Sequence, residues 1–320
     1  MGLAASIEKN WYGRAAGNFW LLPLWALFVM ISSARRVWYR LFTPEKNAVP
    51  VLIVGNIAVG GTGKTPLITC IYELARAQGM KVGVVSRGYG GSASQYPLLV
   101  GRDTSVEESG DEPALLAGRG IPVAVDPVRK RAVSALAAQV DLVLSDDGLQ
   151  HYGMSRDAEI VVSDATRGFG NGWRLPVGPL REPVSRIDEC DLHLVNGRDF
   201  TIEPDALIKA SGHAEPASSL NGLRVHAVAG IGNPARFFDT LRMLGVDVIE
   251  HPFADHHVFV QADVTFDDDL PVVMTEKDWV KCRNFEMPDA GYLRITATPT
   301  PEVTVRIQQL LNKLGANPHG

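Results

Sequence analysis

The glycine-rich run Gly60-Gly-Thr-Gly-Lys-Thr65 constrains the fold of this chain more than any other segment. It follows an apolar, β-branched run over Val49–Gly55 and precedes Pro66–Ala77, which is apolar at helical spacing. A glycine-rich loop between a buried strand and a helix is typical of a P-loop, whose backbone N–H groups surround phosphates. The usual motif begins with glycine where this chain has Ala58, but the strand–loop–helix context is intact.

The loop predicts binding of a nucleoside triphosphate, ATP, together with Mg²⁺. Lys64 is expected to reach the β- and γ-phosphates, and Thr65 to bind the magnesium ion through its hydroxyl. The predicted nucleotide contacts are Gly60, Gly61, Thr62, Gly63, Lys64 and Thr65.

An acidic pair supplies the second half of the predicted magnesium site. Leu142–Leu144 is an apolar strand candidate, and Asp146 and Asp147 follow it after Ser145. The carboxyl end of a parallel strand is where α/β sheets place their ligands, and Mg²⁺ prefers carboxylate oxygens. Asp pairs after strands also form simple turns, but the P-loop favours the metal role.

The rest of the chain alternates strand and helix patterns, which predicts a P-loop NTPase-like, mostly parallel α/β sheet with a second, smaller α/β domain. The domains expected from these patterns are an N-terminal apolar and basic segment, a P-loop domain, a linker rich in Glu, Pro, Ser and Gly, and the smaller C-terminal domain. Their predicted ranges are 1–45, 46–200, 201–222 and 223–320.

The N-terminal segment differs from the rest in charge and composition. Residues 1–40 carry a net charge of +4 and four of the six tryptophans. Because the whole chain has a net charge of −5, the remaining 280 residues carry −9. Residues 15–34 contain no charged residue, but Pro23 and a short apolar centre weaken a membrane span. Tryptophan and arginine around an apolar helix favour a membrane-associating segment at the lipid surface, with packing on the protein or a true span as alternatives.

Composition excludes several classes. An apolar fraction of 46% excludes disorder, and three scattered cysteines indicate neither a disulfide framework nor a zinc site. The acidic net charge argues against a nucleic-acid partner, and the sequence indicates no stable protein partner.

Two hypotheses compete at this point. One is a membrane-associated regulatory ATPase of the MinD/ParA type, but those proteins carry a lysine where this chain has Val59. The other is a small-molecule or lipid kinase, which needs a base for an acceptor hydroxyl. Asp111, Glu112 and the run Asp255-His-His257 suit the kinase and have no role in the ATPase.

Eight motifs, the P-loop and the acidic pair among them, favour the kinase. In chain order they are Gly55-Asn with Val59-Gly-Gly-Thr-Gly-Lys-Thr-Pro66, Ser86-Arg-Gly-Tyr-Gly-Gly91, Gly110-Asp-Glu-Pro113, Asp146-Asp-Gly-Leu-Gln-His151, Gly168-Phe-Gly-Asn-Gly172, Leu175-Pro-Val-Gly-Pro-Leu-Arg-Glu-Pro183, Phe253-Ala-Asp-His256 and Thr275-Glu-Lys-Asp278. With them the chain resembles the tetraacyldisaccharide 4′-kinases, the lipid A 4′-kinases of Gram-negative bacteria. Leu149 stands where this family often has Phe.

The resemblance implies ATP- and Mg²⁺-dependent phosphorylation of the 4′-hydroxyl of the tetraacyldisaccharide 1-phosphate precursor of lipid A, in lipopolysaccharide biosynthesis. It implies a peripheral or monotopic enzyme at the cytoplasmic face of the inner membrane, attached through residues 1–45. Among the site residues it implies Asp111 as catalytic base paired with His256, with Lys64 at the phosphates. The implied magnesium-side residues are Thr65, Asp146, Asp147 and Glu182, and the implied substrate contacts are Arg87, Tyr89, Asn171 and Arg181.

Several of these residues have plainer interpretations. Asp111-Glu-Pro113 also suits a helix N-terminus, and His256 and His257 taken alone are typical surface histidines. The basic cluster Arg129–Arg131 is either a solvated helix start or a phosphate contact. Lys277-Asp278 lacks the spacing of a guanine-reading motif, so GTP specificity is not indicated.

Overall fold

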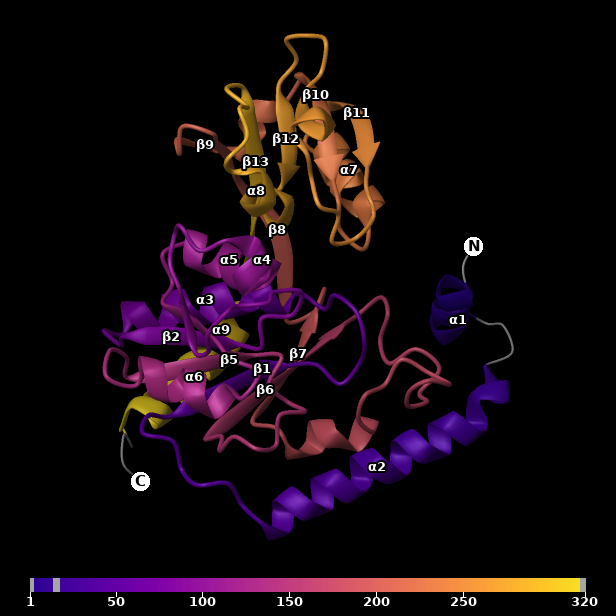
Figure 1. Cartoon of the computed structure of the whole chain (residues 1–320), viewed down its shortest axis with the longest axis vertical. Coiled ribbons are helices and arrows are strands. Elements are labelled where there is room, and N and C mark those ends of the chain that lie inside the picture. The colour runs from indigo at the N-terminus through magenta and orange to yellow at the C-terminus, as the bar shows by residue number, and fades with distance from the viewer. Residues whose placement is uncertain (1–2, 14–17, 317–320) are drawn as a thin grey trace. The chain divides into compact units, whose positions relative to one another are not determined.

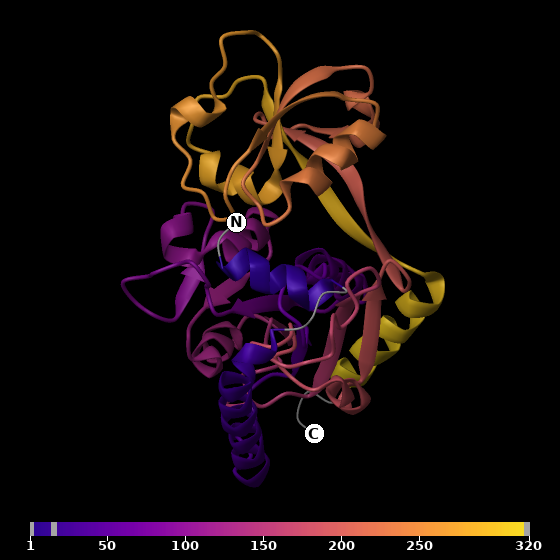
Figure 2. The same ribbon diagram turned by 90° about the vertical axis from the view of Figure 1, so that its right-hand side faces the viewer.

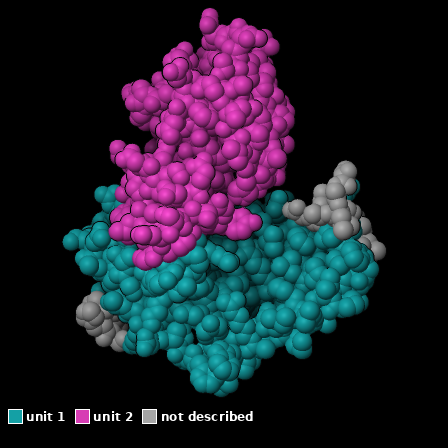
Figure 3. All heavy atoms as spheres, in the orientation of Figure 1, with its two compact units in different colours: residues 1–87, 126–202, 297–320 teal, residues 88–125, 203–296 magenta. Residues whose placement is uncertain are grey.

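The computed structural model describes residues 3–13 and 18–316. The chain divides into two compact units, shown in two colours in Figure 3. Unit 1 comprises residues 1–87, 126–202 and 297–320, and unit 2 comprises residues 88–125 and 203–296. The contiguous domains predicted from the sequence therefore differ from the structure, because the chain leaves and re-enters unit 1 twice.

Unit 1 is built on a parallel sheet with the P-loop strand at its centre. Strand β1 (Val51–Gly55) pairs with β5 (Leu142–Asp146) on one side and β6 (Ala158–Asp164) on the other. Strand β2 (Val82–Ser86) lies outside β5, and β7 (Leu192–Asn196) lies outside β6. All four pairings are parallel, which confirms the predicted α/β class.

Helices cover this sheet because each presents one apolar face. Helix α3 (Lys64–Ala77) buries Leu67, Ile68 and Ile71, and α9 (Pro301–Ala316) packs against it. The other helical elements of unit 1 are α1 (Leu3–Tyr12), η1 (Phe19–Leu21), α2 (Leu22–Leu41), α6 (Arg129–Leu136) and η2 (Val184–Glu189).

Unit 2 contains a second set of strands in the order β11-β10-β12-β13-β8 (Figures 1 and 2). The strands are β8 (Phe200–Lys209), which starts in unit 1, β10 (Arg224–Ala229), β11 (Asp247–Pro252), β12 (Val272–Thr275) and β13 (Ala290–Pro299), which ends in unit 1. The pairings from β11 to β13 are parallel. Strands β3 (Leu98–Val100) and β4 (Val123–Val125) pair antiparallel.

The helical elements of unit 2 carry part of the candidate site. They are α4 (Val106–Ser109), α5 (Asp111–Gly118), α7 (Pro234–Met243), α8 (Glu276–Cys282), η3 (Ala217–Leu220) and η4 (Gln261–Val264).

The predicted linker over residues 201–222 is wrong. This segment forms most of β8, the short strand β9 (Ala214–Pro216), which pairs antiparallel with β8, and η3. The first half of β8 alternates polar and apolar residues, and Glu203, Pro204 and Asp205 give it the composition of a loop. Its strand conformation depends on its neighbours in the sheet, a tertiary effect that local pattern does not show.

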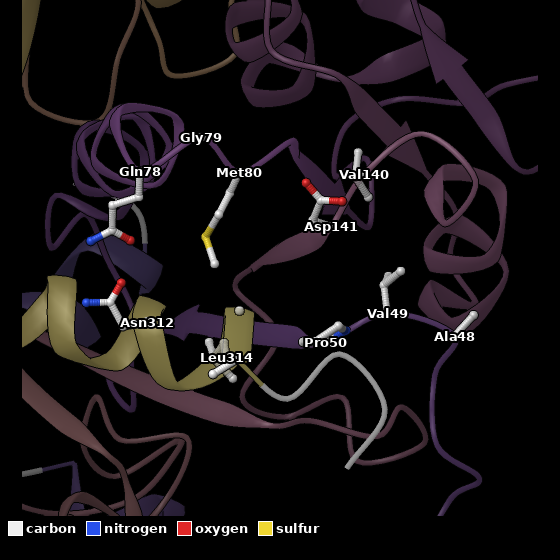
Figure 4. Close-up of a pocket in the computed structure, with 12 residues that line it drawn as sticks. Ala48, Val49, Pro50, Gln78, Gly79, Met80, Val140, Asp141, Asn312 and Leu314 are labelled. Atoms are coloured by element: carbon white, nitrogen blue, oxygen red, sulfur yellow. The ribbon is translucent and has the colours of Figure 1, made fainter.

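A pocket of about 570 Å³ opens at the amino ends of the unit 1 strands (Figure 4). Its walls include Pro50 before β1, Met80 before β2, Asp141 before β5, and Asn312 and Leu314 of α9. The P-loop follows the carboxyl end of β1, so this pocket lies at the opposite edge of the sheet from the nucleotide loop.

Candidate active site

The P-loop adopts the backbone that its glycines permit. Gly60 has φ +112° and Gly63 has φ +89°, a region in which residues with a Cβ are strained. A Cβ on Gly63 would also lie 2.5 Å from Cδ1 of Ile202. Neither position therefore accepts a side chain without displacing the loop.

The loop is held in place from three directions. The Asn56 side-chain amide donates to the Gly60 carbonyl at 3.2 Å, and the Val59 amide donates to the Pro179 carbonyl at 2.9 Å. From helix α1, the Tyr12 hydroxyl donates to the Val59 carbonyl at 3.1 Å. The N-terminal segment thus contacts the nucleotide loop directly, which the sequence did not predict.

Lys64 and Asp147 face each other beside the loop. The Lys64 ammonium lies 3.7 Å from Oδ1 of Asp147, and Arg181 donates to Oδ2 of the same carboxylate at 2.7 Å. Burial alone would raise the pKa of Asp147, but the positive charges of Lys64, Arg181 and Arg129 outweigh it and hold that pKa below its usual value. Asp147 is therefore a carboxylate at neutral pH.

The three residues of the basic cluster separate into different environments. Arg129 is buried and donates to the Asp147 carbonyl at 2.9 Å, and burial lowers its pKa despite the nearby Asp146 and Asp147. Arg131 binds Asp126 through two nitrogens, each 2.8 Å from a carboxylate oxygen, and Lys130 pairs with Glu45. Of the cluster, only Arg129 belongs to the candidate site.

Glu182 is buried within a hydrogen-bonded network. Gln150 donates to its Oε1 at 2.8 Å, and the Tyr152 hydroxyl donates to its Oε2. Burial and the Glu182 charge raise the pKa of Tyr152 to about 12. Both carboxylate oxygens of Glu182 are thus engaged by side chains of the segment that follows Asp147.

The residues at this edge of the sheet fit a magnesium ion. Oδ1 of Asp147 is buried and accepts no hydrogen bond, Asp146 ends β5 beside β1, and Thr65 lies in the first turn of α3. Within residues 3–13 and 18–316, no group of three or more His, Cys, Asp or Glu forms a metal site. That suits Mg²⁺, which usually takes one or two carboxylates and completes its shell with phosphates and water.

Two of the expected substrate contacts in unit 1 differ in their availability. The Asn171 amide donates to the Val177 carbonyl at 3.0 Å and accepts from the Trp173 amide at 3.1 Å, so both its ends hold its own loop. Arg87 follows β2 directly, and its side chain is exposed.

Unit 2 brings together the other predicted pair. Asp111 is the first residue of α5, and its Oδ2 lies 3.1 Å from Nδ1 of His256. Gly110 precedes it at φ +88°, where a Cβ would lie 2.5 Å from the Tyr89 carbonyl oxygen. The exposed Tyr89 ring lies 5.9 Å from the His256 ring. His257 instead bonds Asp263 and packs between two phenylalanines, so its role is structural.

Two lysines beside Asp111 were missed by the sequence reasoning. The ammonium groups of Lys277 and Lys281 lie 3.6 and 3.5 Å from Oδ2 of Asp111. The motif Thr275-Glu-Lys-Asp278 contains Lys277 but was interpreted only as a family motif and for guanine recognition, and Lys281 lies outside it.

Comparison with known proteins shows which family shares this sequence. The family model described as tetraacyldisaccharide-1-P 4′-kinase matches residues 17–313. The chain belongs to the tetraacyldisaccharide 4′-kinase family. Tetraacyldisaccharide 4′-kinases of Pseudomonas putida strain F1 and Hahella chejuensis are 45% and 43% identical to it over 98% of its length, and the match covers 100% and 98% of those proteins.

A solved structure of this family supports the fold. The "apo" form of LpxK from Aquifex aeolicus in complex with ATP is similar to the chain, with a TM-score of 0.81 and 26% identity. The similarity covers 92% of this chain and 98% of that one. The tetraacyldisaccharide 4′-kinase relationship leaves the MinD/ParA alternative without support.

Proposed function

We propose that the chain transfers the γ-phosphoryl group of ATP to the 4′-hydroxyl of a tetraacyldisaccharide 1-phosphate. The observation that carries this proposal is the Asp111–His256 pair, whose Oδ2 and Nδ1 atoms lie 3.1 Å apart. A kinase needs a carboxylate to accept the hydroxyl proton, whereas a regulatory ATPase does not need this pair. Family membership indicates the acceptor.

Phosphoryl transfer depends mainly on positioning and charge stabilisation, and the P-loop residues supply both. Lys64 binds the β- and γ-phosphates, and Arg181 and Arg129 hold Asp147 in place. Thr65, Asp146 and Asp147 would hold the magnesium ion, which would neutralise phosphate charge. Glu182 orients the Arg181 side chain through Gln150, which donates a hydrogen bond to Glu182 and accepts one from Arg181.

The test is transfer of label from γ-³²P-ATP to the tetraacyldisaccharide 1-phosphate. The proposal expects labelled lipid that depends on both Mg²⁺ and the lipid acceptor. Release of labelled inorganic phosphate with no labelled lipid would support the regulatory ATPase and contradict the kinase.

We further propose that helix α2 lies on the surface of the inner membrane. The helix is long and apolar enough to span a bilayer, and only 6% of its most apolar window is buried. Its exposed apolar residues include Trp20 in η1 and Leu24, Leu27, Ile31, Trp38 and Leu41, which are spaced by three, four or seven positions and so share one face. Such a stripe is the pattern of a helix lying in the interface.

The opposite face of α2 is attached to unit 1, which favours the surface over a span. Trp25 packs edge-on against Trp173 with ring centres 5.1 Å apart, and Tyr39 stacks on Tyr152 at 6.3 Å. Arg36 and Arg40 both pair with Glu189. A spanning helix would lose these contacts.

Vesicle flotation of the double variant Leu27→Glu/Ile31→Glu tests this placement. Both side chains are about half exposed, so the changes leave the folded protein intact while placing two charges in the lipid-facing stripe. We expect the fraction floating with anionic vesicles to fall at least about tenfold, because each charge opposes burial in lipid. Met243→Glu, at an exposed position in unit 2, is the control. Unchanged flotation of the double variant would contradict the proposal.

A further inference from the structure

Three donors converge on a single oxygen of Asp111. Nδ1 of His256 lies 3.1 Å from Oδ2, and the ammonium groups of Lys281 and Lys277 lie 3.5 and 3.6 Å from the same atom. Each of the three contacts is thus made with the same carboxylate oxygen, and the Asp111 side chain is 12% exposed.

The two lysines are themselves held in place. They lie four residues apart on α8, which puts them on the same face of the helix. Lys281 is only 8% exposed, contacts Oδ1 of the buried Asp278 at 3.2 Å and lies over the Phe259 ring. Asp278 in turn accepts from the Gly230 amide at 2.9 Å and the Thr275 hydroxyl at 2.6 Å.

Lys277 connects Asp111 to a second carboxylate. Its ammonium also lies 3.5 Å from Oδ1 of Asp255, whose other carboxylate oxygen is 3.8 Å from Nε2 of His256. The remaining acid of α8, Glu276, faces away from the cluster to pair with Arg119. Two ammonium groups and one imidazole thus lie among the carboxylates of Asp111, Asp255 and Asp278.

We propose that Lys277 and Lys281 are positioning residues for the base, an inference that rests on the proposed kinase function. They fix Oδ2 of Asp111 and leave Oδ1 as the atom that accepts the proton of the acceptor hydroxyl. In the transfer step that proton moves to Oδ1 while the hydroxyl oxygen forms a bond to the γ-phosphorus. The bond from the γ-phosphorus to the bridging oxygen breaks, and its electron pair leaves with ADP.

This role also accounts for the charge of the lysines. A carboxylate that works beside a triphosphate is repelled by it, and two ammonium groups behind the carboxylate offset that repulsion. A neutral side chain of similar length would fill the space without holding Oδ2.

The test is a double-mutant cycle with label transfer as the readout. Lys277→Met and Lys281→Met are each made in the wild-type chain and in Asp111→Asn, with Lys277→Arg as the conservative variant and Lys313→Met, exposed on α9, as the control. In the wild-type chain we expect kcat to fall at least about tenfold, with both KM values and the affinity for ATP within about twofold. Lys277→Arg recovers most of kcat, and thermal unfolding midpoints stay within a few degrees.

In the Asp111→Asn chain the same lysine changes should lower kcat by less than about twofold, because the lysines act through Asp111. An equal fold-loss in both backgrounds overturns the inference and indicates a direct contact with substrate. An unchanged kcat in the wild-type background also overturns it. Absence of labelled lipid from the wild-type chain itself refutes the kinase function on which the inference rests.

Discussion

Two residues of the candidate site have a backbone conformation that their side chains disfavour. Among residues 3–13 and 18–316, the non-glycine residues with positive φ are Asp147 at 48° and His256 at 59°. Such conformations cost about 1 kcal/mol or more each and persist where the surroundings impose them. One carries the carboxylate facing Lys64 and the other the imidazole facing Asp111, so the strain coincides with the proposed chemistry.

At Asp111, replacement by Asn keeps the shape of the side chain and removes the proton acceptor. We expect Asp111→Asn to lower kcat by about 10²- to 10⁴-fold, the usual contribution of a general base, with ATP affinity within about twofold. Steady-state label transfer and calorimetric titration with ATP measure the two quantities. Asp103→Asn, an exposed change in the same unit, should leave both unaltered. Near wild-type turnover in Asp111→Asn would remove Asp111 from the role of base.

Sequence reasoning located residues whose chemistry is tied to a short motif and missed those brought in by tertiary packing. Lys64 and Asp147 were predicted from the P-loop and from the end of a strand, and the structure places them 3.7 Å apart. Lys281 was missed because nothing near it in sequence shows that α8 faces Asp111. The cluster Arg129–Arg131 was treated as one feature, although burial separates Arg129 from the other two.

At the scale of elements, helix α1 and the P-loop act as neighbours. The Tyr12 hydroxyl donates to the Val59 carbonyl, and the Trp11 indole N–H donates to the Pro176 carbonyl at 3.1 Å. The backbone amide of Asn171 donates to the Trp11 carbonyl at 2.8 Å. The Arg167 guanidinium lies 5.5 Å from the centre of the Tyr12 ring. Deleting residues 1–40 would therefore disturb the nucleotide loop as well as any membrane contact.

Tyr12→Phe removes the hydroxyl that contacts the P-loop and keeps the ring. One neutral hydrogen bond contributes about 1 kcal/mol, so we expect the affinity for ATP to weaken roughly fivefold. Membrane flotation should remain as in the wild-type chain, because α2 is unchanged. Tyr96→Phe, in unit 2, serves as the matched control for nucleotide binding. Unaltered ATP affinity in Tyr12→Phe would show that α1 does not support the loop.

Several unit 1 elements were predictable because the centres of their strands are apolar and their helices show a clear period. The predicted strand over Val49–Gly55 contains β1, and the predicted helix over Pro66–Ala77 falls within α3. Strands β8, β11 and β13 were not predicted, since each contains charged residues and a proline. Their conformation depends on pairing with neighbouring strands of the sheet, which local sequence pattern does not show.

At the scale of the whole molecule, His151 links stability to pH. Burial, together with the positive charges of Arg129, Arg35, Arg156 and Arg87, lowers the pKa of His151 to about 4. A histidine with a lowered pKa in the folded state favours folding above its unfolded pKa of about 6.5. That stabilisation is lost as the pH falls from about 6.5 toward 4, because the unfolded chain then binds the proton first.

Replacing His151 with Asn should flatten this dependence. After a discount for solvent screening, we expect the free energy of unfolding of the wild-type chain to drop by on the order of 1 kcal/mol more than that of His151→Asn between pH 7 and pH 5. Urea unfolding at the two pH values measures the difference. His213→Gln, exposed in unit 2, should follow the wild-type chain. Parallel curves for wild type and His151→Asn would exclude His151 as the cause.

The division of unit 1 into three segments of the chain determines when it can finish folding during synthesis. Helix α9 is the last described element, yet it belongs to unit 1 and buries Val303, Ile307 and Leu311. It packs on α3, the helix that begins with Lys64. During translation the nucleotide-binding unit therefore lacks helix α9 while residues 203–296 of unit 2 are synthesised. Its core is complete only after α9 has left the ribosome.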